Sequence, residues 1–453
     1  MPSTRVGTFL VAISTMALIL LIPTGAFGQY VVDCTGKTPG AYTTINSVLP
    51  LLSNGAVVRI TGPCTENVTI TGLNNLWIGA PWGQTANLQG NLTINDVQNL
   101  FLHGMNVSNS SGDGIDINNS VGVELDACTS SNNGNFGLSI TNSVVYVQDT
   151  GAINNNGNNG VNAFGNGSLE FNGYSGPITI SNNLGDGIQL QDGVMETLGN
   201  MVITNNKVNP SSFGLGASGS GFGVNLWGHA RAVLWGIFAP DLISGNQAGG
   251  VAVHEGSEIS VSGPTQIAPG VSIGHVIDGN GPVGVSVGFG SQATIWNGVQ
   301  ISHHPDAGVD VYGHSQVFIN GDYQITNNGT GPASTYPTHA GVRVDGNSEA
   351  YIRGGQISQN GGPGILALVN SSIDLSAATL TSNLGGSIVC DSSAWLVSDQ
   401  PILSPPFGGV VPCRVPHSFG PRPLSFSDPA VRAPDISRMK ADQAKYQGLI
   451  SSF

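Results

Sequence analysis

The chain has 453 residues, of which only 9% are charged and 66 are glycine, and this composition excludes a disordered chain and a helical protein. Its formal charge of −14 and its 13 Lys and Arg residues exclude the basic surface that binds nucleic acid, and they disfavour polyanionic ligands. The composition favours short strands joined by tight turns.

Residues 1–28 have the pattern of a secretory signal peptide. Arg5 precedes an apolar run at 9–22, and Pro23 and mostly small residues follow it. An uncleaved membrane anchor is the alternative, but a span needs about 20 apolar residues and this run is shorter. We therefore expect cleavage near Gly28 and an exported protein (extracellular, on the cell surface or periplasmic) that keeps no membrane span.

Residues 29–99 are expected to form an N-terminal cap and the first turns of the fold. Within 43–52, Ile45, Val48 and Leu52 recur at helical spacing, which predicts a short amphipathic helix that Pro50 would kink or shorten. Such a helix would cover the open end of a stack of strands, where apolar side chains and unpaired edges would otherwise face water. Strands are predicted at 57–60 and 68–70.

Residues 100–397 carry a repeat in which glycine is followed by an apolar, a variable and an apolar residue. The glycine spacings cluster near about 23 residues, and the alternation is typical of strands. The sequence therefore predicts an all-β, single-stranded parallel β-helix of about eleven or twelve turns and on the order of 50 Å long. The repeat glycines, which we expect to supply corner conformations with positive φ, are Gly114, Gly137, Gly160, Gly187, Gly223, Gly250, Gly284, Gly308, Gly341 and Gly364.

Asparagine stands four residues before six of these glycines, so the turns would place these side chains in one column at a corner. Amides stacked about 4.8 Å apart can hydrogen-bond along the column, so we assign them a structural role and no catalysis. Two longer segments, 207–221 and 329–339, begin directly after an Asn and should border the same side of the coil. The six asparagines are Asn133, Asn156, Asn183, Asn246, Asn280 and Asn360.

Outward positions after the glycines predict one functional face. Side chains at the same offset lie about 4.8 Å apart on successive turns, and alternate positions on one strand lie about 6.7 Å apart. Aromatic rings flanked by polar groups suit sugars, so the face is predicted to be a glycan-binding groove. Its residues are Trp227, His254, Asp310, Tyr312, Arg343 and Asp345.

A simpler interpretation of this face is an exposed Asp310–Arg343 ion pair of small energetic value beside isolated surface aromatics. A catalytic interpretation is also open, because the backbones of Asp310 and Asp345 would lie roughly 8 Å apart, within the range of inverting glycosidases. That spacing allows acid and base roles without assigning them, so no catalytic residue is predicted.

The remaining histidines do not predict a metal site. His303, His304, His314 and His339 fall at different corners of the coil, whereas a metal needs three or four converging ligands. We expect them to be surface histidines and predict no metal and no cofactor.

Five cysteines in an exported chain predict two disulfides and one free thiol. We expect Cys34 to pair with Cys64 and Cys390 with Cys413, at the two ends of the stack where fraying would begin. Cys128 lies in the middle of the repeats and is predicted to be a buried thiol. Residues 398–453 form a Pro-rich tail in which a short helix is predicted at 435–449.

The segment from Tyr42 to Ile70 resembles the opening of pectin-lyase-like β-helix proteins, and the glycine repeats resemble the repeats of that superfamily. This resemblance implies a right-handed coil with three faces. Val147, Gln148, Asp149 and Thr150 look like the Gln-Asp-Thr element of pectin methylesterases, but the second acidic motif and the Arg-Pro-Trp element are missing. The paired acids of polygalacturonases are missing as well.

Two functions stay open. The first is an exported protein that binds an extracellular polysaccharide on one face, with or without modifying it. The second is a non-catalytic structural or surface-display solenoid, because a fold does not fix a function. The glycan, any reaction and the oligomeric state are not determined by the sequence.

Overall fold

The computed structural model describes residues 28–210, 220–237, 239–263, 274–332, 339–398 and 413–414. The chain divides into two compact units, Met1–Arg414 and Val415–Phe453, and all described residues belong to the first. The predicted signal peptide, apart from Gly28, and the predicted helix at 435–449 lie outside the described residues, as does almost all of the predicted tail.

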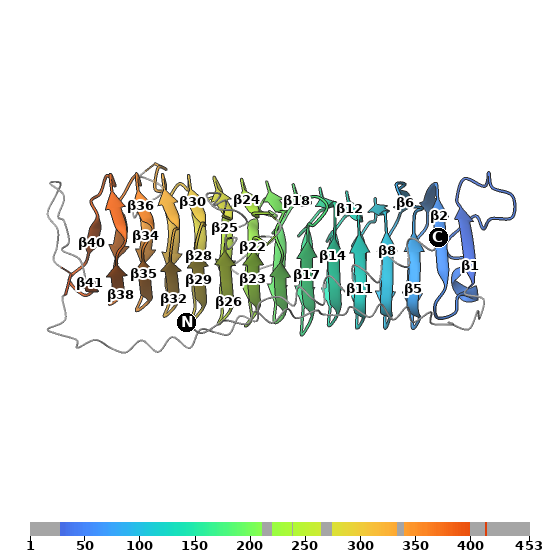
Figure 1. Ribbon diagram of the computed structural model, residues 1–453, viewed down its shortest axis with the longest axis horizontal. Helices are drawn as coiled ribbons and strands as arrows, with labels where there is room; N and C mark the ends of the chain where they lie inside the picture. Colours follow the sequence, from blue (N-terminus) through green and yellow to red (C-terminus); the bar gives the residue numbers. More distant parts are fainter. Residues whose placement is uncertain are drawn as a thin grey trace, which may run out of the picture. The chain divides into compact units, whose positions relative to one another are not determined.

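The described residues form a parallel β-helix in which each full turn contributes one strand to each of three parallel sheets (Figure 1). Sheet A has 15 strands, and sheets B and C have 13 strands each. The strands of sheet A are Gln29–Asp33 (β1), Val57–Thr61 (β2), Asn74–Gly79 (β5), Gln98–His103 (β8), Val121–Asp126 (β11), Val144–Gln148 (β14), Ser168–Asn172 (β17), Val194–Thr197 (β20), Arg231–Trp235 (β23), Glu258–Ser262 (β26), Gln292–Trp296 (β29), Gln316–Asn320 (β32), Glu349–Arg353 (β35), Ser372–Ser376 (β38) and Trp395–Ser398 (β41).

The strands of sheet B are Pro63–Thr65 (β3), Ala86–Gln89 (β6), Met105–Ser108 (β9), Thr129–Ser131 (β12), Gly151–Asn154 (β15), Ile178–Ser181 (β18), Met201–Thr204 (β21), Leu242–Ser244 (β24), Val276–Asp278 (β27), Gln300–Ser302 (β30), Gln324–Thr326 (β33), Gln356–Ser358 (β36) and Thr379–Thr381 (β39). The strands of sheet C are Val68–Thr71 (β4), Leu92–Asn95 (β7), Ile115–Asn118 (β10), Leu138–Thr141 (β13), Val161–Phe164 (β16), Ile188–Gln191 (β19), Phe222–Trp227 (β22), Gly249–Val253 (β25), Val283–Val287 (β28), Ala307–Val311 (β31), Ala340–Val344 (β34), Ile365–Ala367 (β37) and Ile388–Cys390 (β40).

The predicted fold is confirmed, but the coil has more turns than predicted. Sheets B and C each hold 13 strands, so thirteen full turns lie between β1 and β41 and extend over about 65 Å. The prediction counted glycines, whereas the first turns form without the glycine signature because inward apolar pairs such as Val68 and Ile70 suffice. These two side chains are each 1% exposed.

The predicted N-terminal capping helix is not an α-helix. Within residues 43–52, all of which are described, the helical part is a three-residue 3₁₀ helix at Leu49–Leu51 (η1), preceded by turns. Pro50 lies at the start of η1 and has no N–H for the next hydrogen bond, which explains why the helical spacing does not produce a longer helix. Ile45 and Val48 are nevertheless buried, so the predicted apolar contacts form with different backbone geometry.

The predicted asparagine column is confirmed as a buried ladder between sheets B and C. Asn133 Nδ2 donates to Asn156 Oδ1 at 3.0 Å, and Asn156 Nδ2 donates to Asn183 Oδ1 at 2.9 Å. The ladder also includes asparagines that the prediction did not name: Asn206, Asn328 and Asn383. His304 takes the position between Asn280 and Asn328, where its backbone N–H donates to Asn328 Oδ1 at 3.2 Å.

The expected role of the repeat glycines is wrong. None of the ten has positive φ; the left-handed corners are formed mainly by other residues, such as Asn132 (φ 57°) and Asn155 (φ 55°). A Cβ on Gly160 would meet Ile180 Cγ2 at 2.6 Å, Asn183 Nδ2 at 2.7 Å and the Gly187 carbonyl at 2.7 Å. The glycine is therefore required by close packing against the ladder of the next turn.

Candidate functional site

The strand register brings the central pair of the predicted face together. Asp310 on β31 lies directly opposite Arg343 on β34, and Ser286 on β28 lies opposite Asp310 on its other side. Arg343 Nε donates to Asp310 Oδ1 at 2.8 Å, and Arg343 Nη2 donates to Asp310 Oδ2 at 2.7 Å. The predicted spatial neighbourhood of these two residues is therefore present.

This pair is a buried structural element, in contrast to the exposed pair of the simpler interpretation. Arg343 Nη1 also donates to Asp306 Oδ2 at 2.7 Å, and the three side chains are only 11–14% exposed. Burial alone would lower the pKa of Arg343, but hydrogen bonding and attraction from Asp310, together with Asp306, raise it above its ordinary value. The guanidinium occupies both carboxylate oxygens of Asp310, so an acid or base role for Asp310 is not supported.

A second contact group joins His254 and Tyr312. The Tyr312 hydroxyl lies 3.0 Å from His254 Nε2, and His254 Nε2 lies 3.4 Å from the Ser286 hydroxyl. Burial lowers the pKa of His254 to about 4, against an opposing effect of Asp310, so the ring is neutral near pH 7. In a neutral imidazole, the ring nitrogen that carries no hydrogen is an acceptor. Nε2 in that state accepts the hydrogen bond that the Tyr312 hydroxyl donates.

Phe289 completes this group as an exposed ring. Its centroid lies 5.3 Å from Tyr312 with an interplanar angle of 83°, and 5.8 Å from His254 with an angle of 80°. Phe289 is 50% exposed, whereas His254 is 3% exposed. The Tyr312 ring lies across Gly288, where an added Cβ would collide with it. We call Phe289, Tyr312 and His254 the ring cluster.

The other two predicted residues lie at the ends of sheet C strands. Trp227 ends β22 opposite Gln191; the residue is half-buried, and its indole Nε1 is buried without a hydrogen-bond partner among the described residues. Asp345 follows β34, where its backbone N–H donates to the Val311 carbonyl at 2.8 Å, and it is half-buried. No hydrogen bond, ion pair or ring contact joins either side chain to the ring cluster in the part of the chain that the structure describes.

Sequence reasoning missed Asp306, Ser286 and Phe289. Ser286 lies two residues after Gly284, the same offset as Asp310 after Gly308, but it carries no charge or ring. Phe289 lies past the end of the strand, at a corner with φ 56°. Asp306 lies two residues before Gly308, in the connection that leads into sheet C. An acid shortly before a repeat glycine was the available signal, and Asp186, one residue before Gly187, is a second example.

Asp186 forms a separate buried polar group at the start of a sheet C strand. Its Oδ1 accepts from the Phe222 N–H at 2.7 Å, and its Oδ2 accepts from Asn225 Nδ2 at 3.0 Å. Burial raises the pKa of Asp186 to about 6, although these hydrogen bonds oppose the shift.

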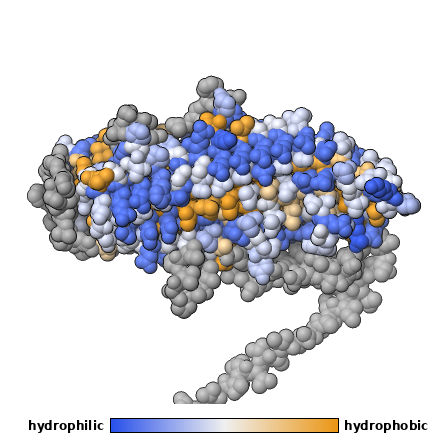
Figure 2. Space-filling model, turned by 90° about the horizontal axis from the view of Figure 1, so that it is seen from above, coloured by the Kyte–Doolittle hydropathy of each residue, from blue (hydrophilic) through white to orange (hydrophobic). Residues whose placement is uncertain are grey.

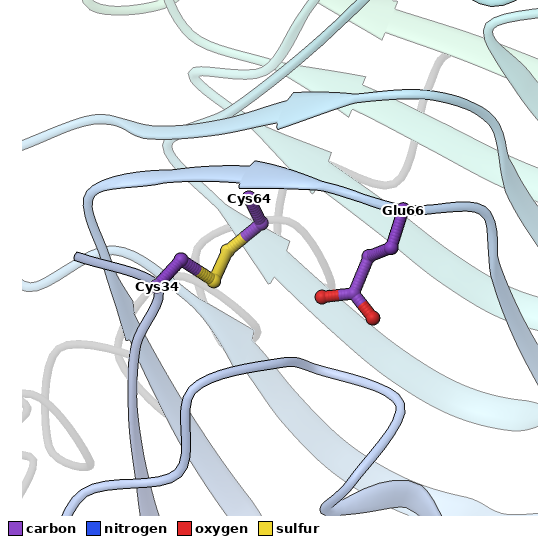
Figure 3. A group of neighbouring side chains, drawn as sticks. All are labelled: Cys34, Cys64 and Glu66. Carbon is purple, nitrogen blue, oxygen red and sulfur yellow. A yellow bond between two sulfur atoms is a disulfide. The ribbon is translucent and has the colours of Figure 1, made fainter. Parts of the chain in front are cut away.

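The two predicted disulfides are present, and Cys128 is a buried free thiol. Cys34 and Cys64 lie near Glu66, but their sulfurs are bonded to each other, so the three side chains do not form a metal site (Figure 3). Glu66 instead accepts hydrogen bonds from the N–H groups of Ile45 at 2.7 Å and Asn46 at 3.0 Å. Glu66 thereby ties the segment at residues 45–46 to the connection between β3 and β4.

The histidines for which a metal role was considered have other surroundings. His303 Nδ1 lies 2.6 Å from Asp278 Oδ1 at the end of a sheet B strand. His304 belongs to the asparagine ladder, and burial lowers its pKa to about 4. His314 lies at a corner with φ 65°.

The fold and this face define a parallel β-helix repeat protein, the fold that the resemblance to pectin-lyase-like proteins implies. No protein-family model and no curated protein matches the sequence. A similar solved structure is the periplasmic alginate epimerase AlgG, with a TM-score of 0.41, 10% identity, and coverage of 80% of this chain and 84% of that chain.

Two further solved structures are similar at lower scores. The A-module of the Azotobacter vinelandii mannuronan C-5 epimerase AlgE6 has a TM-score of 0.30 and 17% identity, with coverage of 83% of this chain and 89% of that chain. Pectate lyase Pel9A has a TM-score of 0.30 and 12% identity, with coverage of 81% of this chain and 78% of that chain. Among the described residues, no helix combines the length and apolar character that a membrane span requires.

Proposed function

We propose that this protein binds an extracellular polysaccharide on the outer face of sheet C, at the ring cluster. The observation that carries the proposal is the half-exposed ring of Phe289, held edge-on against Tyr312 at 5.3 Å. Sugar rings stack their C–H faces on such rings, and half-buried polar side chains such as Asp345 can bind the hydroxyls. Trp227 extends this proposed surface.

The buried ion group has a supporting role in this proposal. Arg343 pairs with Asp310 on β31 and with Asp306 just before that strand, so in this proposal the group joins two neighbouring turns instead of contacting the sugar. We therefore propose binding without turnover, because Arg343 already occupies both carboxylate oxygens of Asp310.

Export is part of the same proposal. Two disulfides form readily in oxidising compartments and rarely in the cytosol, which supports the predicted signal peptide. Polar residues cover much of the surface seen in Figure 2, and apolar residues form separate patches on it.

The test is binding to a panel of neutral and uronate polysaccharides by affinity electrophoresis, with two variants of the ring cluster. Phe289→Ala removes the exposed ring, and Gly288→Ala displaces Tyr312 without removing an aromatic residue. Each should weaken binding about five- to tenfold, the effect of losing an aromatic contact of about 1–1.4 kcal/mol. Tyr174→Ala, at another exposed aromatic (59% exposed), should leave binding unchanged.

If both ring-cluster variants are retarded as strongly as the wild type by every glycan that the wild type binds, the ring cluster is not the binding site. The same samples should be assayed for new reducing ends and unsaturated products. Product formation that Asp345→Asn abolishes would replace the proposal of binding without turnover.

A structural role is the second candidate, and one feature of sheet B favours it. The last outward-facing residue of eleven successive sheet B strands forms a column of mostly small polar side chains. The column contains no aromatic ring and one charged residue, Asp278. Failure of the wild type to bind any polysaccharide would favour this role. The column is Ser108, Ser131, Asn154, Ser181, Thr204, Ser244, Asp278, Ser302, Thr326, Ser358 and Thr381.

A further inference from the structure

Two carboxylates lie on either side of the exposed rings of the ring cluster. The strands β25, β28, β31 and β34 are successive in sheet C (Figure 1). The Gly256 N–H donates to the Phe289 carbonyl at 3.2 Å, so Glu255 lies at the same corner as Phe289, one turn earlier. The register of β31 and β34 places Asp345 in line with Tyr312, one turn later. The backbones of the two acids are three turns apart, which is about 14 Å.

Both acids are available to a ligand. Glu255 is exposed, and Asp345 is half-buried. Within the described ranges, no hydrogen bond or ion pair engages the side chain of either residue. The half-exposed ring of Phe289 therefore lies between two carboxylates that have no partner there.

The arginines close to these acids are already paired. Arg343 is the one Lys or Arg in the thirteen sheet C strands, and its guanidinium binds Asp306 and Asp310. Arg231, past the corner on β23, pairs with Glu258 at 3.0 Å. The described sheet C strands therefore offer no free guanidinium or ammonium group to a ligand that carries carboxylates.

The backbone of this corner does not account for a glutamate beside a phenylalanine. Glu255 and Phe289 both have φ 56°, a left-handed conformation that Gly and Asn adopt at lower cost. Asn and Gly do occupy the equivalent corner elsewhere, as at Asn119 and Gly165. Residues held in this conformation against their preference point to a role of their side chains.

We propose that Glu255 and Asp345 make the ring cluster selective for uncharged polysaccharides and against polyuronates. This inference rests on the proposed binding function and names the class of glycan. The hydroxyl groups of a sugar that stacks on Phe289 can donate to either carboxylate, which gives charge-assisted hydrogen bonds.

A uronate in the same place would bring a third carboxylate close to Glu255 or Asp345, with no basic side chain to offset it. Repulsion between two unit charges 4 Å apart weakens binding about fivefold even with the dielectric constant of bulk water, and more strongly at a protein surface. Two such acids should therefore disfavour a polyuronate by about tenfold or more.

The experiment uses calorimetry with matched pairs of oligosaccharides. Each neutral oligosaccharide that binds the wild type is compared with the same oligosaccharide oxidised at C6, which converts hydroxymethyl groups to carboxylates on an unchanged backbone. Two exposed histidines, His229 and His314, lie at the same corner, so the measurement is made at about pH 8, where an ordinary imidazole is neutral. The ratio of the two affinities is the measured quantity, so a general loss of binding cancels.

The wild type should bind the neutral oligosaccharide at least about tenfold more tightly than the oxidised one, and added salt should reduce this preference. The double variant Glu255→Gln, Asp345→Asn keeps both side-chain shapes. Its preference should fall to about threefold or less and should no longer depend on salt.

Asp96→Asn is the matched control. Asp96 is an exposed acid with φ 53° at the same corner, six turns before Glu255 and about 29 Å away, so its loss should leave the wild-type preference unchanged. Thermal melting of each variant checks that it is folded.

The outcomes separate this inference from the proposed function. Equal affinity of the wild type for the two oligosaccharides, binding of polyuronates alone, or an undiminished preference in the double variant would each overturn the selectivity and leave glycan binding in place. Failure of the wild type to bind any glycan would overturn both.

Discussion

At the scale of single residues, the buried charges on sheet C have the largest consequences. Arg343 binds the carboxylates of Asp306 and Asp310, whose side chains are 11% and 12% exposed. A buried ion pair contributes little net stability as a whole, but removal of one partner leaves the others with uncompensated charge. Arg343, on one turn, thus compensates the charge of both aspartates on the turn before it.

Arg343→Met should therefore lower the free energy of unfolding by about 3–5 kcal/mol. The triple variant Arg343→Met, Asp306→Asn, Asp310→Asn should recover most of that loss, because it removes the buried charges together. Urea unfolding followed by circular dichroism measures both. Equal stability of Arg343→Met and the wild type would show that the ion group is solvated and not buried.

The sequence predicted part of this site, and the rest depended on packing that periodicity does not describe. Asp310 and Arg343 were placed together because the repeat fixes which residues align on successive turns. The burial of this pair was not predicted, since the offset rule gives the direction of a side chain but not what covers it. Phe289 was missed for a similar reason: corner residues lie outside the alternation.

At the scale of single elements, the asparagine ladder defines the corner between sheets B and C. Most of its members hydrogen-bond through their side-chain amides to the turns above and below, whereas His304 interrupts the series. Its buried Nδ1 has no partner among the described residues, and Nε2 lies 3.1 Å from the Ile277 carbonyl. The repeat glycines complete this element, because their missing side chains make room for the next amide.

His304→Asn should stabilise the protein by about 1–2 kcal/mol at pH 7, because it replaces an unsatisfied nitrogen with an amide that fits the ladder. The gain should grow below pH 6.5. Burial lowers the folded-state pKa of His304 to about 4, so between pH 6.5 and 4 the unfolded chain binds a proton that the folded chain does not. Wild-type stability falls over that range, by on the order of 3 kcal/mol from this group.

Parallel urea titrations of the wild type and His304→Asn at pH 7.0 and 4.5 measure this difference. The reverse substitution, Asn246→His, places the same defect elsewhere in the ladder and should be destabilising, more so at pH 4.5. A stability difference between His304→Asn and the wild type that does not change with pH would show that His304 is protonated without cost in the folded state.

At the scale of the whole described stack, stability is distributed over many similar interfaces. Each turn contacts chiefly its two neighbours, so the two end turns are the weakest points. One disulfide lies near each end: Cys34–Cys64 joins residues 30 positions apart, and Cys390–Cys413 joins residues 23 positions apart. The sequence predicted both pairings from position alone, since only cysteines at the same end can meet.

Replacement of either disulfide by a pair of serines should destabilise the adjacent end turns by about 3 kcal/mol and leave the middle turns almost unchanged. Hydrogen exchange resolved by peptide should show faster exchange in β1 and β2 for the Cys34/Cys64 variant, and in β40 and β41 for the Cys390/Cys413 variant. Cys128→Ala serves as the control for loss of a thiol in the middle of the stack. Uniformly faster exchange along the coil would contradict the nearest-neighbour description.

The single arginine between two aspartates has a further consequence for how a repetitive chain finds its one correct alignment. Most turns resemble one another closely, so a chain that skipped a turn while folding would still pair apolar residues with apolar residues and amides with amides. Arg343 can neutralise Asp306 and Asp310 only when the 307–311 and 340–344 strands are immediate neighbours. A skipped turn would leave the charges of Asp306, Asp310 and Arg343 buried without their partners. These three residues therefore destabilise misalignments that the rest of the repeat tolerates.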